Sequence, residues 1–164
     1  HLEKLEAGVS VVQIVGEFED KLNAADLTLL IQKPETPVYV MADGRHFWRV
    51  IDNLMNNICK YAQPGTRVYV DLRENGGQVE LIFRNTSRYP LNISSEELME
   101  RFVRGDESRN TEGSGLGISI AKSLMELMGG SFMLYVDGDL FKVVLGFAQI
   151  AEEKEPLNED ESGK

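Results

Sequence analysis

The sequence predicts a two-layer α/β sandwich, an α+β fold in which about three helices cover one face of a mixed, mainly antiparallel sheet. Three observations favour this class. Apolar residues recur at helical spacing in three separate segments, which predicts three amphipathic helices. The turn sequences "NGG" (75–77) and "DGD" (137–139) each lie between two strand-like runs, which predicts hairpins. The 164 residues are enough for one domain with a buried core.

The first third of the chain is expected to contribute two helices and a hairpin. Residues 1–9 have a helical composition, so we expect the end of a preceding helix or a cloning remnant there. Residues 10–25 should form an amphipathic helix. Strands are expected at 27–31 and 38–42, joined by a proline-bracketed turn into a hairpin, and a second helix should follow over 44–61. The apolar face of the first helix consists of Val11, Ile14, Val15, Phe18 and Leu22.

The rest of the chain is expected to hold two hairpins with a helix between them. Residues 67–74 and 78–85 flank the first turn, and residues 131–136 and 140–150 flank the second. The third helix lies within 115–130, where two consecutive glycines close it.

The connection at 86–112 is long and polar. Its one short predicted helix, 94–102, begins with the capping-box spacing of Ser94 and Glu97. Connections of this length are usually functional or mobile, so the segment is a candidate lid over a binding site.

Charge and composition exclude several classes of function. The net charge of −10 argues against nucleic acid binding, which depends on basic residues. Residues 152–164 hold six acids and two lysines, so we expect 151–164 to be an acidic disordered tail after a domain that spans 10–150. The single cysteine excludes an internal disulfide and fits a reducing compartment. No apolar run is long enough to span a membrane, so no membrane contact is expected of this fragment.

The helix at 44–61 carries amides on one face. Asn53, Asn57 and Lys60 fall at positions i, i+4 and i+7, away from the apolar stripe of the same helix. Two amide oxygens one turn apart, with an ammonium just beyond, suit Mg²⁺ that carries phosphates. A solvated helix face without a ligand is the alternative.

A glycine-rich stretch, "GSGLG" at 113–117, precedes the third helix. Glycines let a backbone approach a ligand closely, and the free N–H groups at a helix start favour anions. The spacing is neither that of a dinucleotide-binding turn nor that of a P-loop. A flexible helix cap is therefore the alternative to a phosphate site.

Three segments together resemble one family. "NLMNNICKYA" (53–62) resembles the N box of sensor histidine kinases, "RFVRGDESRN" (101–110) resembles their F box, and "EGSGLGISIAKSLMELMGG" (112–130) resembles their second glycine box. The order and spacing agree, and the resemblance runs from about residue 10 to residue 149. It implies the HATPase domain, with the Bergerat ATP-binding fold shared with type II topoisomerases and MutL proteins.

The resemblance implies ATP and Mg²⁺ as cofactors and assigns roles to residues of the N box. Asn57 matches the Mg²⁺ ligand. Asn53 matches the position at which ATP-hydrolysing relatives carry a glutamate base, and an amide there cannot deprotonate water. Lys60 and Tyr61 match phosphate and adenine-pocket positions.

The other two boxes supply the lid and the phosphate turn. Phe102 and Arg104 match lid positions, with Arg104 placed to meet the γ-phosphate. Asn53, Lys60 and Arg104 are the residues implied to act in catalysis. The phosphate-binding turn consists of Gly113, Ser114, Gly115, Leu116 and Gly117.

The sequence departs from the family in two ways. The first glycine box should read D-x-G-x-G, but the chain has "RNTSRYPLN" there, with Asn85 at the adenine-reading position and no glycine nearby. An amide oxygen can accept a hydrogen bond from adenine, without the charge of a carboxylate. The phosphoacceptor pattern of histidine, acid and proline is also missing, and His46 is read as a surface histidine at a helix start.

The expected function is therefore the catalytic domain of a two-component sensor histidine kinase. The domain would transfer the γ-phosphate to a histidine on a separate dimerisation domain, and a response regulator would follow. We expect the fragment to be monomeric and cytoplasmic, as part of a homodimeric, membrane-anchored parent. Two alternatives stay open: a degenerate docking module of the same fold without nucleotide, and a serine kinase of the anti-sigma-factor type.

Overall fold

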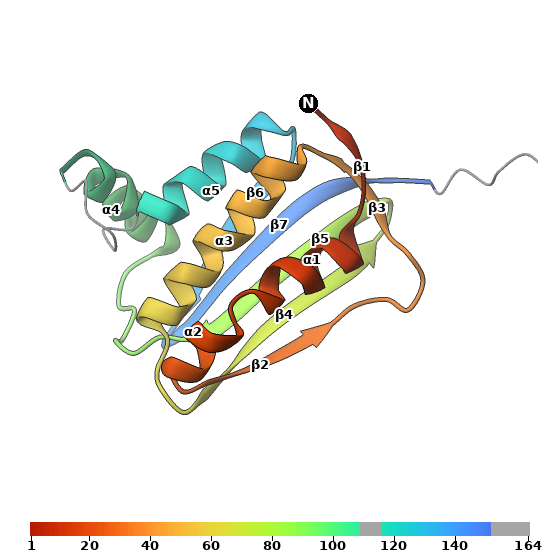
Figure 1. The fold of residues 1–164 in the computed structure, drawn as a ribbon. Helices are drawn as coiled ribbons and strands as arrows, with labels where there is room; N and C mark the ends of the chain where they lie inside the picture. Colours follow the sequence, from red (N-terminus) through yellow and green to blue (C-terminus); the bar gives the residue numbers. More distant parts are fainter. Residues whose placement is uncertain (109–115, 152–164) are drawn as a thin grey trace, which may run out of the picture.

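The computed structural model describes residues 1–108 and 116–151, which form a sheet layer and a helix layer (Figure 1). Within these residues the sheet has seven strands in the order β1-β3-β7-β5-β4-β2, and β6 pairs with β7 outside this path. The strands are β1 (Glu3–Glu6), β2 (Leu27–Gln32), β3 (Tyr39–Ala42), β4 (Thr66–Asn75), β5 (Gln78–Thr86), β6 (Ser131–Asp137) and β7 (Leu140–Ile150). The helices are α1 (Ala7–Gly16), α2 (Glu19–Ala24), α3 (Gly44–Tyr61), α4 (Ser95–Ser108) and α5 (Leu116–Leu127).

The sheet is mixed and mainly antiparallel, as predicted. Only the pair β2 and β4 runs parallel, from Leu27 opposite Thr66 to Gln32 opposite Asp71. In Figure 1, α1, α3 and α5 lie over one face of the sheet, while α4 stands apart at the edge of the helix layer. No helix among the described residues is long and apolar enough to cross a membrane.

Several predicted elements are confirmed. Helix α3 has the predicted bounds, and both hairpins, β4 with β5 and β6 with β7, pair antiparallel. The first hairpin turns at Gly76 and Gly77, whose φ angles of 56° and 83° favour glycine. Gly129, with φ of 77°, follows the end of α5 in the same way.

Two predictions about the N-terminal part are wrong. The segment Glu3–Glu6 is a strand that pairs with β3, because this pairing outweighs its local helical preference. The sheet therefore starts before residue 10. The strands β2 and β3 do not form a hairpin either, since β2 pairs with β4 and β3 pairs with β1 and β7. Local turn chemistry cannot reveal a parallel pairing with a strand so distant in sequence.

Two helix boundaries also differ from the prediction. The segment 10–25 is divided into α1 and α2, and the break falls at Glu17 and Phe18, where Phe18 is buried. The short helix expected at 94–102 is the longer α4, so much of the connection at 86–112 is helical. The predicted cap is present, because the Glu97 backbone N–H donates to the Ser94 Oγ at 3.1 Å.

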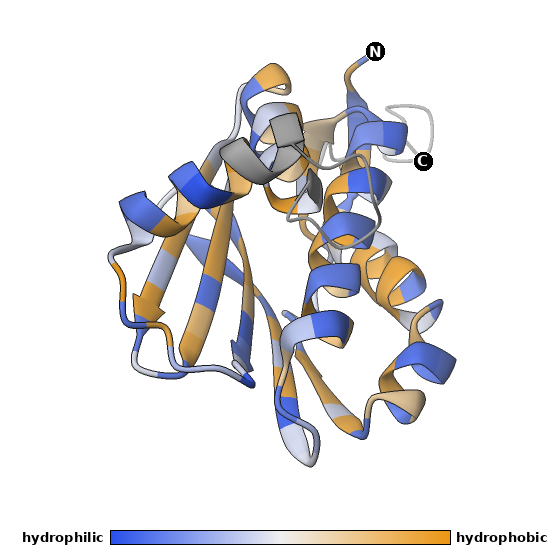
Figure 2. Cartoon of the chain, turned by 90° about the vertical axis from the view of Figure 1, so that its left-hand side faces the viewer, coloured by the Kyte–Doolittle hydropathy of each residue, from blue (hydrophilic) through white to orange (hydrophobic). Residues whose placement is uncertain are grey.

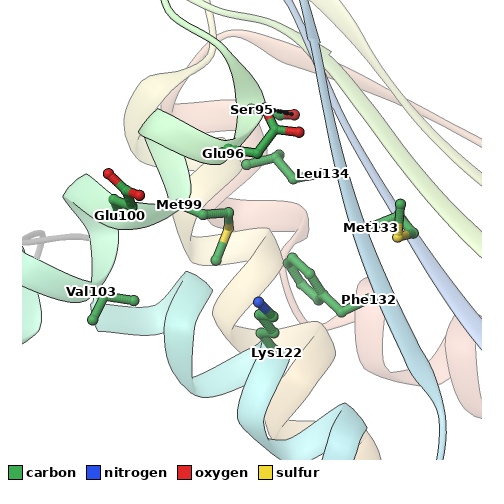
Figure 3. A pocket seen from close by; sticks show the side chains of 9 residues that line it. All are labelled: Ser95, Glu96, Met99, Glu100, Val103, Lys122, Phe132, Met133 and Leu134. Atoms are coloured by element: carbon green, nitrogen blue, oxygen red, sulfur yellow. Dashed lines mark hydrogen bonds between the residues drawn. The ribbon is translucent and has the colours of Figure 1, made fainter.

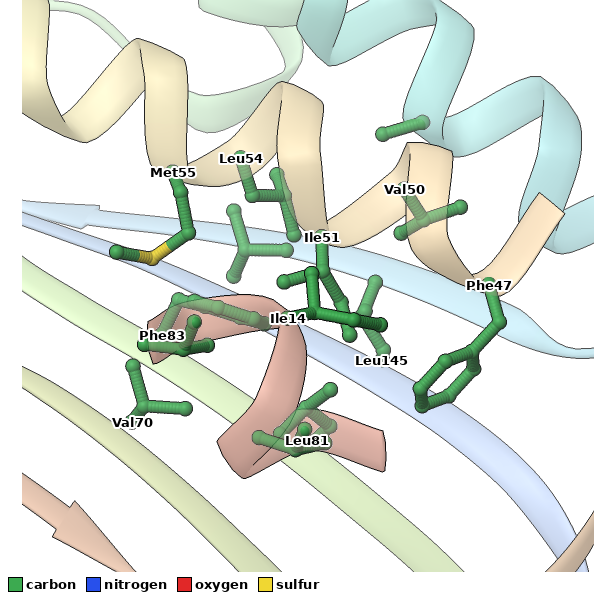
Figure 4. Packing of buried hydrophobic residues seen from close by; sticks show 14 of the residues in the cluster. Ile14, Phe47, Val50, Ile51, Leu54, Met55, Val70, Leu81, Phe83 and Leu145 are labelled. Carbon is green, nitrogen blue, oxygen red and sulfur yellow. The ribbon is translucent and has the colours of Figure 1, made fainter. Parts of the chain in front are cut away.

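The core lies between the two layers. Ile51 and Leu54 of α3 point toward Leu81, Phe83 and Leu145 of the sheet (Figure 4), and all five are at most 2% exposed. Figure 2 shows hydrophobic and hydrophilic residues alternating along the strands and helices of both layers. This packing fixes α3 against the sheet and so fixes the direction of its polar face.

Candidate functional site

The start of α3 is capped by Asp43. Its carboxylate accepts hydrogen bonds from the backbone N–H groups of Arg45 at 2.9 Å and His46 at 3.1 Å. The bond from His46, helped by the amino terminus of His1, lowers the pKa of Asp43 to about 2. His46 thus sits in the first turn of the helix, as predicted.

The amide face of α3 meets the start of α5. A β-carbon at Gly117 would lie 3.3 Å from the Cβ of Asn53 and 3.5 Å from its Cγ. Glycine therefore lets the first turn of α5 lie directly against Asn53. The Nδ2 of Asn53 is buried and has no hydrogen-bond partner within residues 1–108 and 116–151.

Asn85 is a second buried amide, on the helix-facing side of β5. The residue is 4% exposed, and its Oδ1 has no hydrogen-bond partner in the described part of the chain. A buried polar atom without a hydrogen-bond partner lowers the stability of the folded protein by roughly 1–3 kcal/mol. An unpaired donor at Asn53 and an unpaired acceptor at Asn85 are what a site for a polar ligand would present before the ligand binds.

The end of α3 is tied to the chain that follows Asn85. The Arg88 backbone N–H donates to the Tyr61 carbonyl, and that of Gln63 donates to the Thr86 carbonyl, both at 2.8 Å. Asn57 is about one turn before Tyr61, so the amide face and Asn85 belong to the same end of the fold.

Phe102 of the candidate lid is joined to this region through Phe141. Their rings are 6.5 Å apart and nearly perpendicular, at 89°. Phe141 is also the direct β7 neighbour of Asn85 in the sheet register. Phe141 could not be predicted as part of this region from the sequence, because its position opposite Asn85 depends on the register of β5 and β7.

The predicted pair Lys60 and Tyr61 is close together. The Lys60 ammonium lies 5.2 Å from the centre of the Tyr61 ring, in a cation–π arrangement. Lys60 is exposed and Asn57 is half-buried. No hydrogen bond among the described residues joins Lys60 to Asn53 or to Asn57.

Asn56, the third asparagine of the helix, belongs to a different side. Its Oδ1 accepts a hydrogen bond from Lys21 at 2.9 Å, and its Nδ2 donates to Asp52 at 3.3 Å. Burial raises the pKa of Asp52, and the nearby Lys21 cation opposes this shift. Asn56 therefore stabilises the contact between α2 and α3 and is not part of the site.

The remaining predicted residues lie outside the described part of the chain. These are Gly113, Ser114 and Gly115 in full, and the side chains of Arg104 and Leu116. The described residues hold no group of three or more His, Cys, Asp or Glu side chains that could bind a metal ion. The amide oxygens of Asn53 and Asn57 remain as hard donors of the kind Mg²⁺ accepts, and the unpaired amide of Asn53 beside Gly117 fits a bound polar group.

Sequence comparison places the same region in one family. Residues 42–156 match the family described as histidine kinase-, DNA gyrase B- and HSP90-like ATPase. The chain is 34% identical over 110 residues to the probable sensor protein PcoS of Escherichia coli, covering 65% of the chain and 24% of PcoS. It is 29% identical over 136 residues to the probable sensor kinase SilS of Salmonella typhimurium, covering 81% of the chain and 27% of SilS. The chain thus spans about a quarter of the length of these relatives.

Solved structures give the same fold. The catalytic domain of the histidine kinase ThkA superposes with a TM-score of 0.76 at 18% identity, over 91% of the chain and 98% of that domain. The mycobacterial sensor histidine kinase MprB gives a TM-score of 0.73 at 19% identity, over 93% of the chain and all of the compared MprB chain. The expected two-layer fold is therefore that of histidine kinase catalytic domains.

Proposed function

Because the chain belongs to the family of histidine kinase-, DNA gyrase B- and HSP90-like ATPases, we propose that it binds Mg·ATP as the catalytic domain of a sensor histidine kinase. The nucleotide would lie between α3 and the start of α5, beneath the segment 86–112. The observation that carries this proposal is the pair of unpaired buried amide atoms, on Asn53 and Asn85, at the end of the fold where Gly117 lets α5 approach α3.

We infer a role in binding for each polar group of the site. Asn57 would hold Mg²⁺, which would neutralise part of the charge of the phosphates. The Oδ1 of Asn85 would accept a hydrogen bond from the adenine amino group. Lys60 and Arg104 would neutralise the phosphates, and the backbone of 113–117 would approach them closely.

The chemistry rests mainly on positioning. Asn53, unlike a glutamate at this position, cannot take a proton from water, so the γ-phosphate is preserved for transfer. The acceptor would be a histidine on a dimerisation domain of the same parent protein, and a response regulator would receive the phosphate next. His46 would not be that acceptor, because the family's phosphoacceptor pattern of histidine, acid and proline is missing around it.

One observation favours a second candidate, a docking module of the same fold that binds no nucleotide. Asn85 stands where the family carries an aspartate, so the strongest contact to adenine would be weakened. The two candidates differ in one measurable property, the binding of Mg·ATP.

The test is calorimetric titration of the chain with ATP, with and without Mg²⁺, for the natural sequence and two variants. Asn57→Ala should weaken Mg²⁺-dependent binding at least on the order of tenfold, because it removes the metal ligand. Asn56→Ala is the matched control, since it changes the same residue type one position earlier in α3, and it should bind normally. Circular dichroism establishes that both variants are folded. A folded natural chain that does not bind ATP would support the docking module instead.

A further inference from the structure

A groove of about 640 Å³ lies between α4, α5 and β6 (Figure 3). Its apolar lining residues are Met99 and Val103 of α4 and Phe132, Met133 and Leu134 of β6, and Lys122 of α5 also lines it. Lys122 is roughly 140° around α5 from Gly117 at about 100° per residue. The groove therefore opens on a different side of α5 from the candidate nucleotide site.

One wall of the groove is the edge of the sheet. Along Ser131–Asp137, β6 pairs only with β7, so the backbone groups on its other edge have no strand partner in the described structure. Phe132 and Leu134 turn toward the helix layer and are 8% exposed, whereas Met133 turns to the other face and is 50% exposed. A free edge of this kind is a template for another strand.

The other wall is acidic. Glu96 and Glu100 stand one turn apart on α4, and both line the groove. Among the described residues, neither carboxylate forms an ion pair, and the Lys122 ammonium forms none either. The α4 side of the groove thus offers unpaired negative charge to a basic group, next to the apolar side chains that α4 and β6 contribute to the lining.

We propose that this groove binds an extended segment of a partner protein, which adds a strand to the free edge of β6. Alternate apolar side chains of the segment would enter the groove, and a lysine or arginine would meet Glu96 and Glu100. A helix fits less well. A helix would leave the backbone groups on the free edge of β6 unpaired.

The experiment starts from a random peptide library displayed on phage, selected on the full chain. We expect the enriched peptides to alternate apolar residues and to carry a lysine or arginine. One such peptide, added to isotopically labelled protein, should shift the NMR amide signals of Ser131–Asp137 and of α4. The same peptide with alternate backbone nitrogens methylated should lose binding, because it cannot donate to β6.

A charge variant tests the acidic wall. Glu100→Lys should weaken binding of the basic peptide on the order of tenfold. Glu126→Lys, on an exposed position of α5 that does not line the groove, is the matched control and should bind normally. The proposal is overturned if no peptide is enriched, if enriched peptides are acidic or bind as helices, or if methylation or Glu100→Lys leaves the affinity unchanged.

Discussion

Asn53 and Asn85 each bury one amide atom without a partner in the described structure, although most buried polar atoms in proteins are hydrogen-bonded. Each unpaired atom lowers the stability of the free protein. A ligand that pairs with both would relieve this cost, so the two residues contribute more to the stability of the bound protein than to that of the free one.

Gly117 should be sensitive to even a methyl group. In Gly117→Ala the new β-carbon would lie 3.3 Å from the Cβ of Asn53, so α5 or Asn53 must move, and ATP affinity should fall on the order of tenfold. Gly16→Ala is the control, because a β-carbon at the end of α1 would have no neighbour within 4 Å. It should leave ATP affinity unchanged and leave the protein equally stable or slightly more stable. Equal ATP affinity of both variants in calorimetry would show that this contact does not position Asn53.

Asn85→Asp should lower the stability of the nucleotide-free protein but raise its affinity for ATP. Without nucleotide, a carboxylate at this buried position has no partner, so the free energy of unfolding should fall by about 2 kcal/mol or more. The affinity for ATP should rise roughly fivefold, because a charged acceptor binds the adenine amino group more strongly. Urea unfolding with and without Mg·ATP measures both effects, and Asn92→Asp, at an exposed position, should produce neither. A variant whose unfolding is unaffected by Mg·ATP would contradict the assigned contact.

Among the secondary-structure elements, α3 combines a core-facing stripe and the amide face. Its bounds could be predicted because the signals are local: Asp43 caps its start, and Phe47, Ile51, Leu54 and Ile58 repeat at helical spacing. The hairpins were predictable for the same reason, from "NGG" and "DGD".

The pairing of β2 with β4 could not be predicted, because it joins distant segments with no turn between them. Likewise, Asn53 and Asn57 could be assigned to one face, but the burial of Asn85 and its place beside Phe141 depend on the sheet register.

The Asp43 cap should make α3 sensitive to acid. Hydrogen bonds in the folded state lower the pKa of Asp43 from 3.8 to about 2, so the ionised carboxylate stabilises the fold above about pH 4. This contribution should disappear as the pH falls from about 4 to about 2. An asparagine at this position would keep a capping oxygen without a charge, so Asp43→Asn should show a smaller loss of stability over this range. Urea unfolding between pH 6 and pH 2 measures the difference between the natural protein and Asp43→Asn. Asp137→Asn, which removes an exposed carboxylate at the second hairpin turn, is the control and should lose stability over this pH range as the natural protein does.

At the scale of the whole molecule, the two ends of the described chain meet in the sheet. β1 pairs with β3, and β3 pairs with the end of β7, with Tyr39 opposite Ile150. Glu6 strengthens this corner, because its Oε1 accepts from the backbone N–H groups of Gly8 and Val38, both at 3.1 Å. The sheet therefore includes residues 3–6, which were expected to precede the domain.

Truncation tests that boundary. Removal of residues 1–6 should lower the free energy of unfolding by at least about 2 kcal/mol, because it deletes β1 and the cap at the start of α1. Removal of residues 1–2, both exposed, should change it by less than about 0.5 kcal/mol. Chemical denaturation compares the two truncations. If the two truncated proteins are equally stable, the domain begins near residue 10, as the sequence predicted.

The ladder between β3 and β7 also bears on how the protein is made. Strand β3 is synthesised well before β7, because its partners Gln149 and Ile150 follow it by more than a hundred residues. Until then β3 can pair only with β1, and the edge that β7 will cover stays open. The hairpin of β4 and β5 needs no such wait, since its strands follow each other directly. During translation, the edge of β3 that β7 will cover is thus synthesised well before its partner, and for that interval it is an open template for pairing with another chain.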